Sequence, residues 1–224
     1  PSGPPTALSG QETFLAVVFS LGSGYLFSYV TLALIHLLEG FAGQSSTNAV
    51  SAVESSLPPV VAIVAFAVVA PVAEEFIFRR LLLDRVRIFG DGAAILIGGA
   101  AFGLFHGNLN QTLYAFVLGA VFSAIVLLTN RLRYTIGIHM LINGISVLTT
   151  LMESDLLDYL LACVILFSIC FSVVLFFVRR KHYTLEPGPL PFSRAEKAHA
   201  CFTSPWVWIL LVGGLLFSGV SIFL

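Results

Sequence analysis

Four ionisable side chains follow directly on an apolar run that is typical of the middle of a membrane helix. The run "VVAIVAFAVVA" is followed at positions 71–82 by "PVAEEFIFRRLL", which contains Glu74, Glu75, Arg79 and Arg80. Ionisable groups within a membrane span are costly and usually belong to a functional site. Their spacing should therefore indicate which of them can do chemistry.

Helical spacing separates the two glutamates. Glu75 and Arg79 are four residues apart, so they lie on one helix face and can form a buried ion pair. Glu74 is rotated by about 100° from Glu75 and cannot easily share that pairing. We expect Arg79 to neutralise Glu75, which leaves Glu74 free to act as a base towards water. The structural alternative is that the pair only fixes a helix in place and that Glu74 lies at the membrane interface.

Two later apolar segments add imidazole and amide groups at the same interval. "FGLFH" places Phe102 four residues before His106, and "HMLIN" places His139 four residues before Asn143. Taken singly, such polar residues more often make hydrogen bonds between helices, and Phe102 suits a core position. Peptide hydrolysis, however, needs a base for water and donors for the developing oxyanion. One carboxylate, two imidazoles and one amide supply both.

Other chemistries of membrane enzymes fit less well. The sequence has no HExxH motif of a zinc protease, and its aspartates near the apolar segments fall at segment ends or in loops. Ser23 in "GSGY" is the nearest serine nucleophile, and its surroundings do not single it out. A metal site stays open as an alternative, because zinc could be ligated by Glu74, His106, His139 and Asn143.

The rest of the chain consists of the apolar segments that must hold these residues. Of its 224 residues, 58% are hydrophobic and 10% are charged, and the mean hydropathy is +0.97. These values are typical of an integral membrane protein. Segments long enough to cross a bilayer lie at 14–38, 58–83, 92–107, 110–130, 134–151, 156–178 and 205–224. We therefore predict an all-α, polytopic transmembrane bundle of about seven helices.

Depth within the bilayer tests whether the candidate residues can meet. Gly90 is expected at a hairpin turn, and Glu74 and His106 each lie sixteen residues from it, which predicts a similar depth. The small residues of "GGAAFG" favour close packing of the segment before His106 on a neighbour. His139 fits less closely: counted from the basic residues at the segment ends, it lies about 9 Å deep and Glu74 about 16 Å deep.

The distribution of charge predicts an orientation. If the first segment runs outward, all eleven Lys and Arg residues fall on one side, and the opposite loops at 39–57, 107–110 and 151–156 contain none. The basic side is therefore predicted to face the cytoplasm. A net charge of −1 and the lack of a basic patch give no indication of nucleic acid binding.

Four regions are predicted along the chain. They are an N-terminal tail at 1–13, a membrane core at 14–181 with the catalytic helices at 58–150, a proline-rich cytoplasmic linker at 182–204 and a final membrane helix at 205–224. The sequence begins with "PSGPP" and not with Met, so the tail could be a cut end or a tag remnant.

The three polar motifs, taken in order, resemble those of a known family. "EEFIFR", "FGLFH" and "HMLIN" are similar to the motifs EExxxR, FxxxH and HxxxN of the CAAX prenyl endopeptidases and bacteriocin-processing or immunity proteins, also called the Abi family. The resemblance covers roughly residues 58–150. The family core usually has eight helices, so a count of seven fits a missing N-terminal helix or a miscount.

The resemblance implies an intramembrane protease of glutamate type that needs no cofactor. The implied roles are water activation by Glu74 and His106, oxyanion stabilisation by His139 and Asn143, and support by Glu75, Arg79 and Phe102. The implied partners are membrane lipid and a membrane-associated peptide or protein substrate. The implied location is the cell membrane of a prokaryote, with the site open to the cytoplasm.

Two other functions could use the same polar cluster. One is a non-proteolytic scaffold or immunity protein that binds a partner helix. The other is an ion-coupled transporter in which Glu74 binds a proton or cation. Transporters often contain internal repeats, and this sequence shows none. A zinc-dependent protease remains the third alternative.

Overall fold

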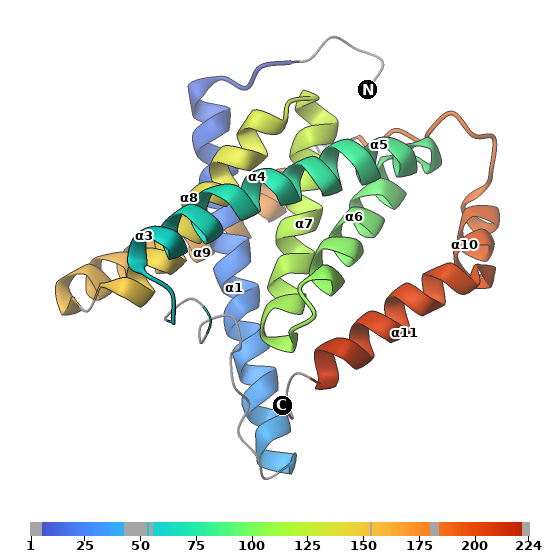
Figure 1. Ribbon diagram of the computed structural model, residues 1–224. Helices are drawn as coiled ribbons and strands as arrows, with labels where there is room; N and C mark the ends of the chain where they lie inside the picture. The colour runs from blue at the N-terminus through green and yellow to red at the C-terminus, as the bar shows by residue number, and fades with distance from the viewer. Residues whose placement is uncertain (1–5, 43–52, 54–55, 153, 180–183, 221–224) are drawn as a thin grey trace.

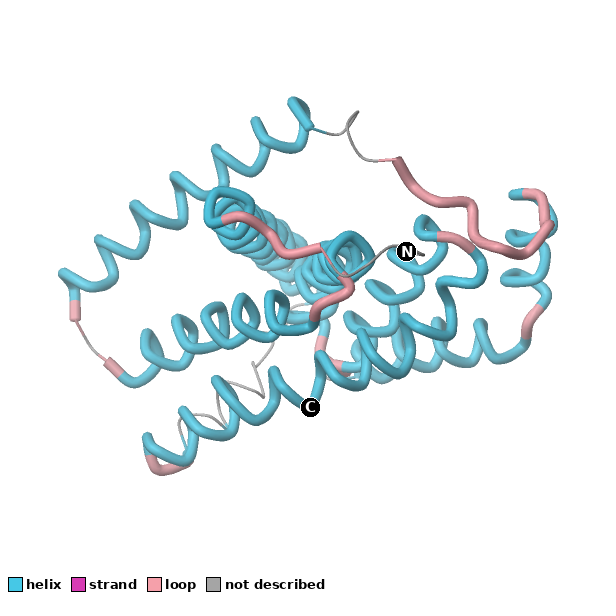
Figure 2. The backbone as a smooth tube through the Cα atoms, turned by 90° about the horizontal axis from the view of Figure 1, so that it is seen from above, coloured by secondary structure: helices cyan, strands magenta, loops and turns pink. Residues whose placement is uncertain are grey.

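The computed structural model describes residues 6–42, 53, 56–152, 154–179 and 184–220. The regular elements in these ranges are helices, and none of the described residues forms a strand (Figures 1 and 2). The prediction of an all-α bundle is therefore confirmed. Residues 1–5 and 221–224, at the two ends of the predicted regions, lie outside the described residues.

Each predicted apolar segment coincides with a described helix. The single helices are α1 (Gly10–Ala42), α6 (Asp91–Phe105), α7 (Leu109–Thr129), α8 (Leu132–Leu151), α9 (Asp155–Arg179), α10 (Arg194–Thr203) and α11 (Pro205–Val220). Five helical stretches of the described chain are long and apolar enough to cross a membrane: Gly10–Phe41, Pro59–Phe89, Leu109–Thr129, Leu132–Leu151 and Asp155–Arg179. The protein is therefore an integral membrane protein.

The helix at 59–89 carries both glutamates and is not uniformly α-helical. Its parts are α3 (Pro59–Ala62), the π-helical η1 (Ile63–Val69), α4 (Ala70–Glu75), the π-helical η2 (Phe76–Leu82), α5 (Leu83–Val86) and the 3₁₀-helical η3 (Arg87–Phe89). It runs obliquely across the bundle (Figure 1). The short segment α4, with Glu74 and Glu75, therefore lies between two π-helical stretches, which are often found at functional sites.

Small residues let α6 and α7 pack closely, as the sequence predicted. A Cβ atom added to Gly99 would lie 2.8 Å from the carbonyl oxygen of Phe116, and one added to Gly103 would lie 2.6 Å from that of Thr112. A similar contact joins α1 and α9, where Gly22 faces the carbonyl of Ser168 with no room for a side chain. The bundle is thus held by close backbone approaches, which are common between helices in membranes.

The turn between η3 and α6 occurs at Gly90, as predicted. Gly90 has φ 100°, which favours glycine. The chain that follows α9 lies against this turn: the N–H of Asp91 donates to the carbonyl of Glu186 at 2.9 Å, and the N–H of Glu186 donates to Oδ2 of Asp91 at 3.0 Å. Gly188, with φ 82°, also contacts Gly90. Part of the predicted linker is therefore anchored, and its last residues form α10.

Candidate active site

Glu75 and Arg79 form the predicted ion pair within one helix. Nε of Arg79 lies 3.3 Å from Oε2 of Glu75, and both side chains are 0% exposed. Nη1 of Arg79 also donates to Oγ of Ser123 on α7 at 3.1 Å, and this hydroxyl donates to the carbonyl of Gly119 at 2.8 Å. The pair therefore fixes the helix at 59–89 against α7.

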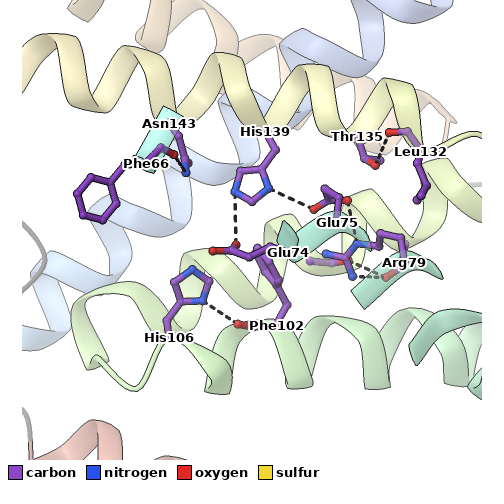
Figure 3. A network of polar contacts seen from close by, with 12 residues as sticks. Phe66, Glu74, Glu75, Arg79, Phe102, His106, Leu132, Thr135, His139 and Asn143 are labelled. Carbon is purple, nitrogen blue, oxygen red and sulfur yellow. Dashed lines mark hydrogen bonds and ion pairs between the residues drawn. The ribbon is translucent and has the colours of Figure 1, made fainter. Parts of the chain in front are cut away.

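His139 on α8 lies between the two glutamates (Figure 3). Its Nδ1 is 3.2 Å from Oε1 of Glu75, and because a carboxylate accepts, the ring nitrogen donates. Its Nε2 is 3.8 Å from Oε2 of Glu74, which is ion-pair range but too long for a hydrogen bond. The predicted difference in depth between Glu74 and His139 therefore does not keep their side chains apart.

The two neighbouring glutamates occupy different environments. The side chain of Glu75 is fully buried and bonded, whereas that of Glu74 is 17% exposed. Oε2 of Glu74 is buried and has no hydrogen-bond partner among the described residues. This difference follows from the rotation between adjacent positions of a helix: one carboxylate faces Arg79, and the other faces the space between α6 and α8. Glu74 is thus available to bind a small polar molecule.

His106 lies at the end of α6, where it is the residue that caps the helix, and not within a helix as predicted. Its Nδ1 is 2.8 Å from the carbonyl oxygen of Phe102 and donates to it. In a neutral ring this leaves Nε2 with a free lone pair. Figure 3 shows this nitrogen turned towards the carboxylate of Glu74, on the side opposite His139 in that view.

The ring of Phe102 packs against three of the polar side chains, those of His106, His139 and Arg79. It is 2% exposed, and its ring centroid lies 5.0 Å from that of His106 and 5.7 Å from that of His139. The guanidinium carbon of Arg79 lies 5.0 Å from the same centroid. Aromatic and cation–π contacts of this kind are attractive. Phe102 is therefore a buried core residue that contacts both imidazoles and the guanidinium.

Asn143 points to a different part of the helix at 59–89. Its Nδ2 donates to the carbonyl oxygen of Phe66 on η1 at 3.0 Å (Figure 3). It lies one turn along α8 from His139, and its amide nitrogen carries a second hydrogen. The structure thus brings Glu74, Glu75 and His139 into direct contact, with His106 joined through Phe102, and it places Asn143 beside them and bonded to the backbone.

Some residues of the site were not identified from the sequence. Ser123 contacts Arg79, and the ring of Phe122 lies 5.6 Å from that of His139. A serine or a phenylalanine in an apolar segment gives no sign of such a contact, because most serines in membrane helices bond to their own backbone. Only the three-dimensional structure shows that α7 packs against the ion pair of Glu75 and Arg79.

The residues named for the alternative zinc site are those of the same polar cluster. Within the described parts of the chain, no group of three or more His, Cys, Asp or Glu side chains is arranged to hold a metal ion. The imidazole of His139 already faces carboxylates with both nitrogens, and Asn143 bonds to Phe66. The arrangement fits hydrogen bonding better than metal ligation.

The chain is similar to known membrane proteases. Residues 56–145 match the model of the type II CAAX prenyl endopeptidase Rce1-like family. The membrane-embedded CAAX protease MroQ of Staphylococcus aureus (strain USA300) is 26% identical over 147 residues, which cover 61% of this chain and 59% of MroQ. The chain thus spans about three fifths of the length of this relative. No solved structure matches significantly. The region matched by the family model contains all three polar motifs, so in this part the chain is similar to the type II CAAX prenyl endopeptidase Rce1-like family.

Proposed function

We propose that this protein is an intramembrane endopeptidase of glutamate type that hydrolyses a peptide bond in a membrane-associated peptide or protein. One observation carries the proposal: Glu74 is partly exposed and lies between two imidazoles, while its neighbour Glu75 is buried in an ion pair. A carboxylate with an open side and a nearby ring nitrogen is suited to bind and deprotonate water. The similarity of residues 56–145 to the family and the protease activity named for the relative agree with this reaction.

The proposed reaction begins with a water molecule between Glu74 and His106. Glu74 takes one proton while the water oxygen attacks the carbonyl carbon of the scissile bond. The lone pair on Nε2 of His106 accepts the other hydrogen of the water and orients it. The tetrahedral intermediate then breaks its C–N bond, and the proton taken by Glu74 passes, directly or through His106, to the leaving amine. The products are a carboxylic acid and an amine, so atoms and charge balance.

The contacts of Asn143 and His139 limit which of them can donate a hydrogen bond to the oxyanion. Asn143 has one amide hydrogen on Phe66 and a second one available for a substrate oxygen. His139 faces two carboxylates, so it must turn from Glu74 before it can donate to a substrate. We therefore propose Asn143 as the more direct oxyanion donor and His139 as a donor only after substrate binding.

The position in the membrane follows from charge. We propose that the site opens to the cytoplasmic side of a prokaryotic cell membrane, because the Lys and Arg residues of the chain fall on one predicted side. The partners would then be membrane lipid and a substrate that enters from the bilayer or its cytoplasmic surface. Labelling of single cysteines in the loops at 107–110 and 130–131, from each side of sealed vesicles, would check this orientation.

The experiment that tests the reaction compares the native chain with Glu74→Gln. Both are purified, reconstituted in liposomes with a library of membrane peptides, and the new termini are identified by mass spectrometry. We expect Glu74→Gln to reduce cleavage roughly 10²–10⁴-fold, as removal of a general base does. Glu196→Gln, an exposed glutamate on α10, is the matched control and should cleave normally.

Retained cleavage by Glu74→Gln would contradict the proposal. Equal thermal unfolding midpoints for the native chain and Glu74→Gln would show that a loss of cleavage is not a loss of fold. If neither chain cleaves any peptide and partner binding is unchanged by the substitution, the protein is a scaffold and not a protease.

A further inference from the structure

Pro71 interrupts the hydrogen bonding of the helix three residues before Glu74. Proline has no backbone N–H, so inside a helix it leaves a carbonyl oxygen without its usual donor. Within a membrane such a carbonyl is costly, since no water is present to satisfy it. A proline this close to the proposed base therefore needs a compensating donor.

The helical register around Pro71 identifies the carbonyl concerned. The stretch before it, η1, is π-helical, and the N–H of Ala70 donates to the carbonyl of Ala65, five residues back. In the same register the next N–H, at position 71, would point to the carbonyl of Phe66. Proline offers none, and Nδ2 of Asn143 donates to the carbonyl oxygen of Phe66 at 3.0 Å.

The packing of α8 on η1 holds Asn143 in this position. Val147, one turn after Asn143, is 2% exposed and belongs to a buried cluster with Ala62 and Ala67 of the helix at 59–89. A Cβ atom added to Gly144 would lie 4.0 Å from the Cβ of Ala67, which is ordinary contact. The amide therefore reaches Phe66 from a well-packed surface.

The contacts from α8 lie on both sides of Pro71. Asn143 bonds to Phe66 before the proline, and His139 bonds to Glu75 after it. Two attachments one turn apart on α8 thus fix the segment of the other helix that contains Pro71. Glu74 lies within this segment, so its direction depends on both attachments.

We propose that Asn143 is a positioning residue whose side-chain amide takes the place of the backbone N–H that Pro71 lacks, and that it thereby sets the direction of the Glu74 carboxylate. The inference rests on the proposed function for its effect on cleavage, but its structural part does not. This role stands beside the oxyanion role, because one amide hydrogen of Asn143 bonds to Phe66 and the other is left for the substrate. The bond to Phe66 can be replaced by a change in the helix itself, whereas the bond to the substrate cannot.

Pro71→Ala supplies that change. In the variant Asn143→Ala the carbonyl of Phe66 loses its donor, and a displacement of Glu74 of about 1 Å would lower kcat/KM roughly 100-fold, mainly through kcat. In Pro71→Ala/Asn143→Ala the new N–H can bond to Phe66, and we expect recovery of about tenfold or more of that loss. The thermal unfolding midpoint should fall in Asn143→Ala and rise again in the double variant.

The control is Pro59→Ala/Asn143→Ala. Pro59 lies in the first turn of the same helix, where a missing N–H leaves no carbonyl without a partner. This variant should show no recovery of midpoint or cleavage. Asn143→Leu, which has a similar size but no hydrogen-bond donor, should behave as Asn143→Ala does.

Each outcome decides the proposal. Recovery of midpoint and cleavage by Pro71→Ala, without recovery by Pro59→Ala, supports it. An unchanged midpoint in Pro71→Ala/Asn143→Ala overturns it. A recovered midpoint with no recovered cleavage overturns the positioning role and leaves Asn143 with its contact to the substrate alone. If the native chain cleaves nothing, the proposed function fails, while the midpoints alone still decide whether Asn143 serves Pro71.

Discussion

Nδ1 of His139 lies 3.2 Å from Oε1 of Glu75, a residue 64 positions earlier in the chain. The other oxygen of the same carboxylate is paired with Arg79, which in turn reaches Ser123 on α7. One buried carboxylate thus connects three helices. Removing any one of these side chains should weaken the contacts that the remaining ones make, and it should lower the stability of the bundle.

Arg79→Met should strongly destabilise the protein. It leaves Glu75 buried without its cationic partner, and such a loss costs about 3–5 kcal/mol in the free energy of unfolding. Arg80→Met is the control, because Arg80 pairs with Asp84 and its side chain is 60% exposed; the expected cost is about 0–1 kcal/mol. Thermal unfolding in detergent measures both. Equal midpoints for the two variants would contradict the role of the buried pair.

Ser123→Ala should lower stability and cleavage together. Nη2 of Arg79 has no partner among the described residues, so loss of the Ser123 hydroxyl leaves the guanidinium with its bond to Glu75 alone. We expect a cost of about 1–3 kcal/mol for the unsatisfied donor. Ser23→Ala is the matched control, since the hydroxyl of Ser23 donates to the carbonyl of Phe19 in its own helix. Cleavage as low in Ser23→Ala as in Ser123→Ala would argue against a specific effect.

Phe102→Leu should lower stability and cleavage, although an apolar side chain still fills the position. Leucine keeps an apolar side chain but removes the ring contacts with His106, His139 and Arg79, at a total cost of about 1–3 kcal/mol. Cleavage should fall because both imidazoles lose a fixed neighbour. Phe167→Leu removes a ring contact with Phe171 on the exposed face of α9 and should leave cleavage unchanged. The idea fails if Phe102→Leu cleaves at the native rate.

Chelators should have little effect on cleavage. The proposed reaction uses side chains alone, so prolonged treatment with EDTA or a phenanthroline, followed by the liposome assay, should leave the rate unchanged. Loss of activity that zinc restores, together with one zinc ion per chain by elemental analysis, would replace the metal-free reaction with the zinc alternative.

The sequence was sufficient for the apolar helices and for naming most of the residues that meet in the candidate site, because both depend on short-range spacing. Hydropathy located the apolar segments, and Glu75 and Arg79 could be paired because residues four apart share a helix face. The turn at Gly90 also followed from local composition. The family motifs then identified the remaining polar residues before any contact was known.

The parts that the sequence could not predict depend on distant contacts or on small changes in helical register. The two π-helical stretches contain mainly apolar residues and differ little in pattern from an ordinary helix. Pro71 interrupts the hydrogen bonding of its helix, but Asn143, which bonds to the carbonyl of Phe66, is more than seventy residues away in the sequence. Likewise, Ser123 becomes relevant only when α7 is placed against Arg79.

The contact between Gly90 and Gly188 ties the segment between α9 and α10 to the bend between the helix that carries Glu74 and the helix that leads to His106. Each glycine occupies a backbone conformation that other residues rarely adopt, and neither has space for a methyl group. A cut, an inserted tag or a bulky substitution in residues 184–188 would thus disturb the turn between the helix at 59–89 and α6, the two helices that carry Glu74 and His106.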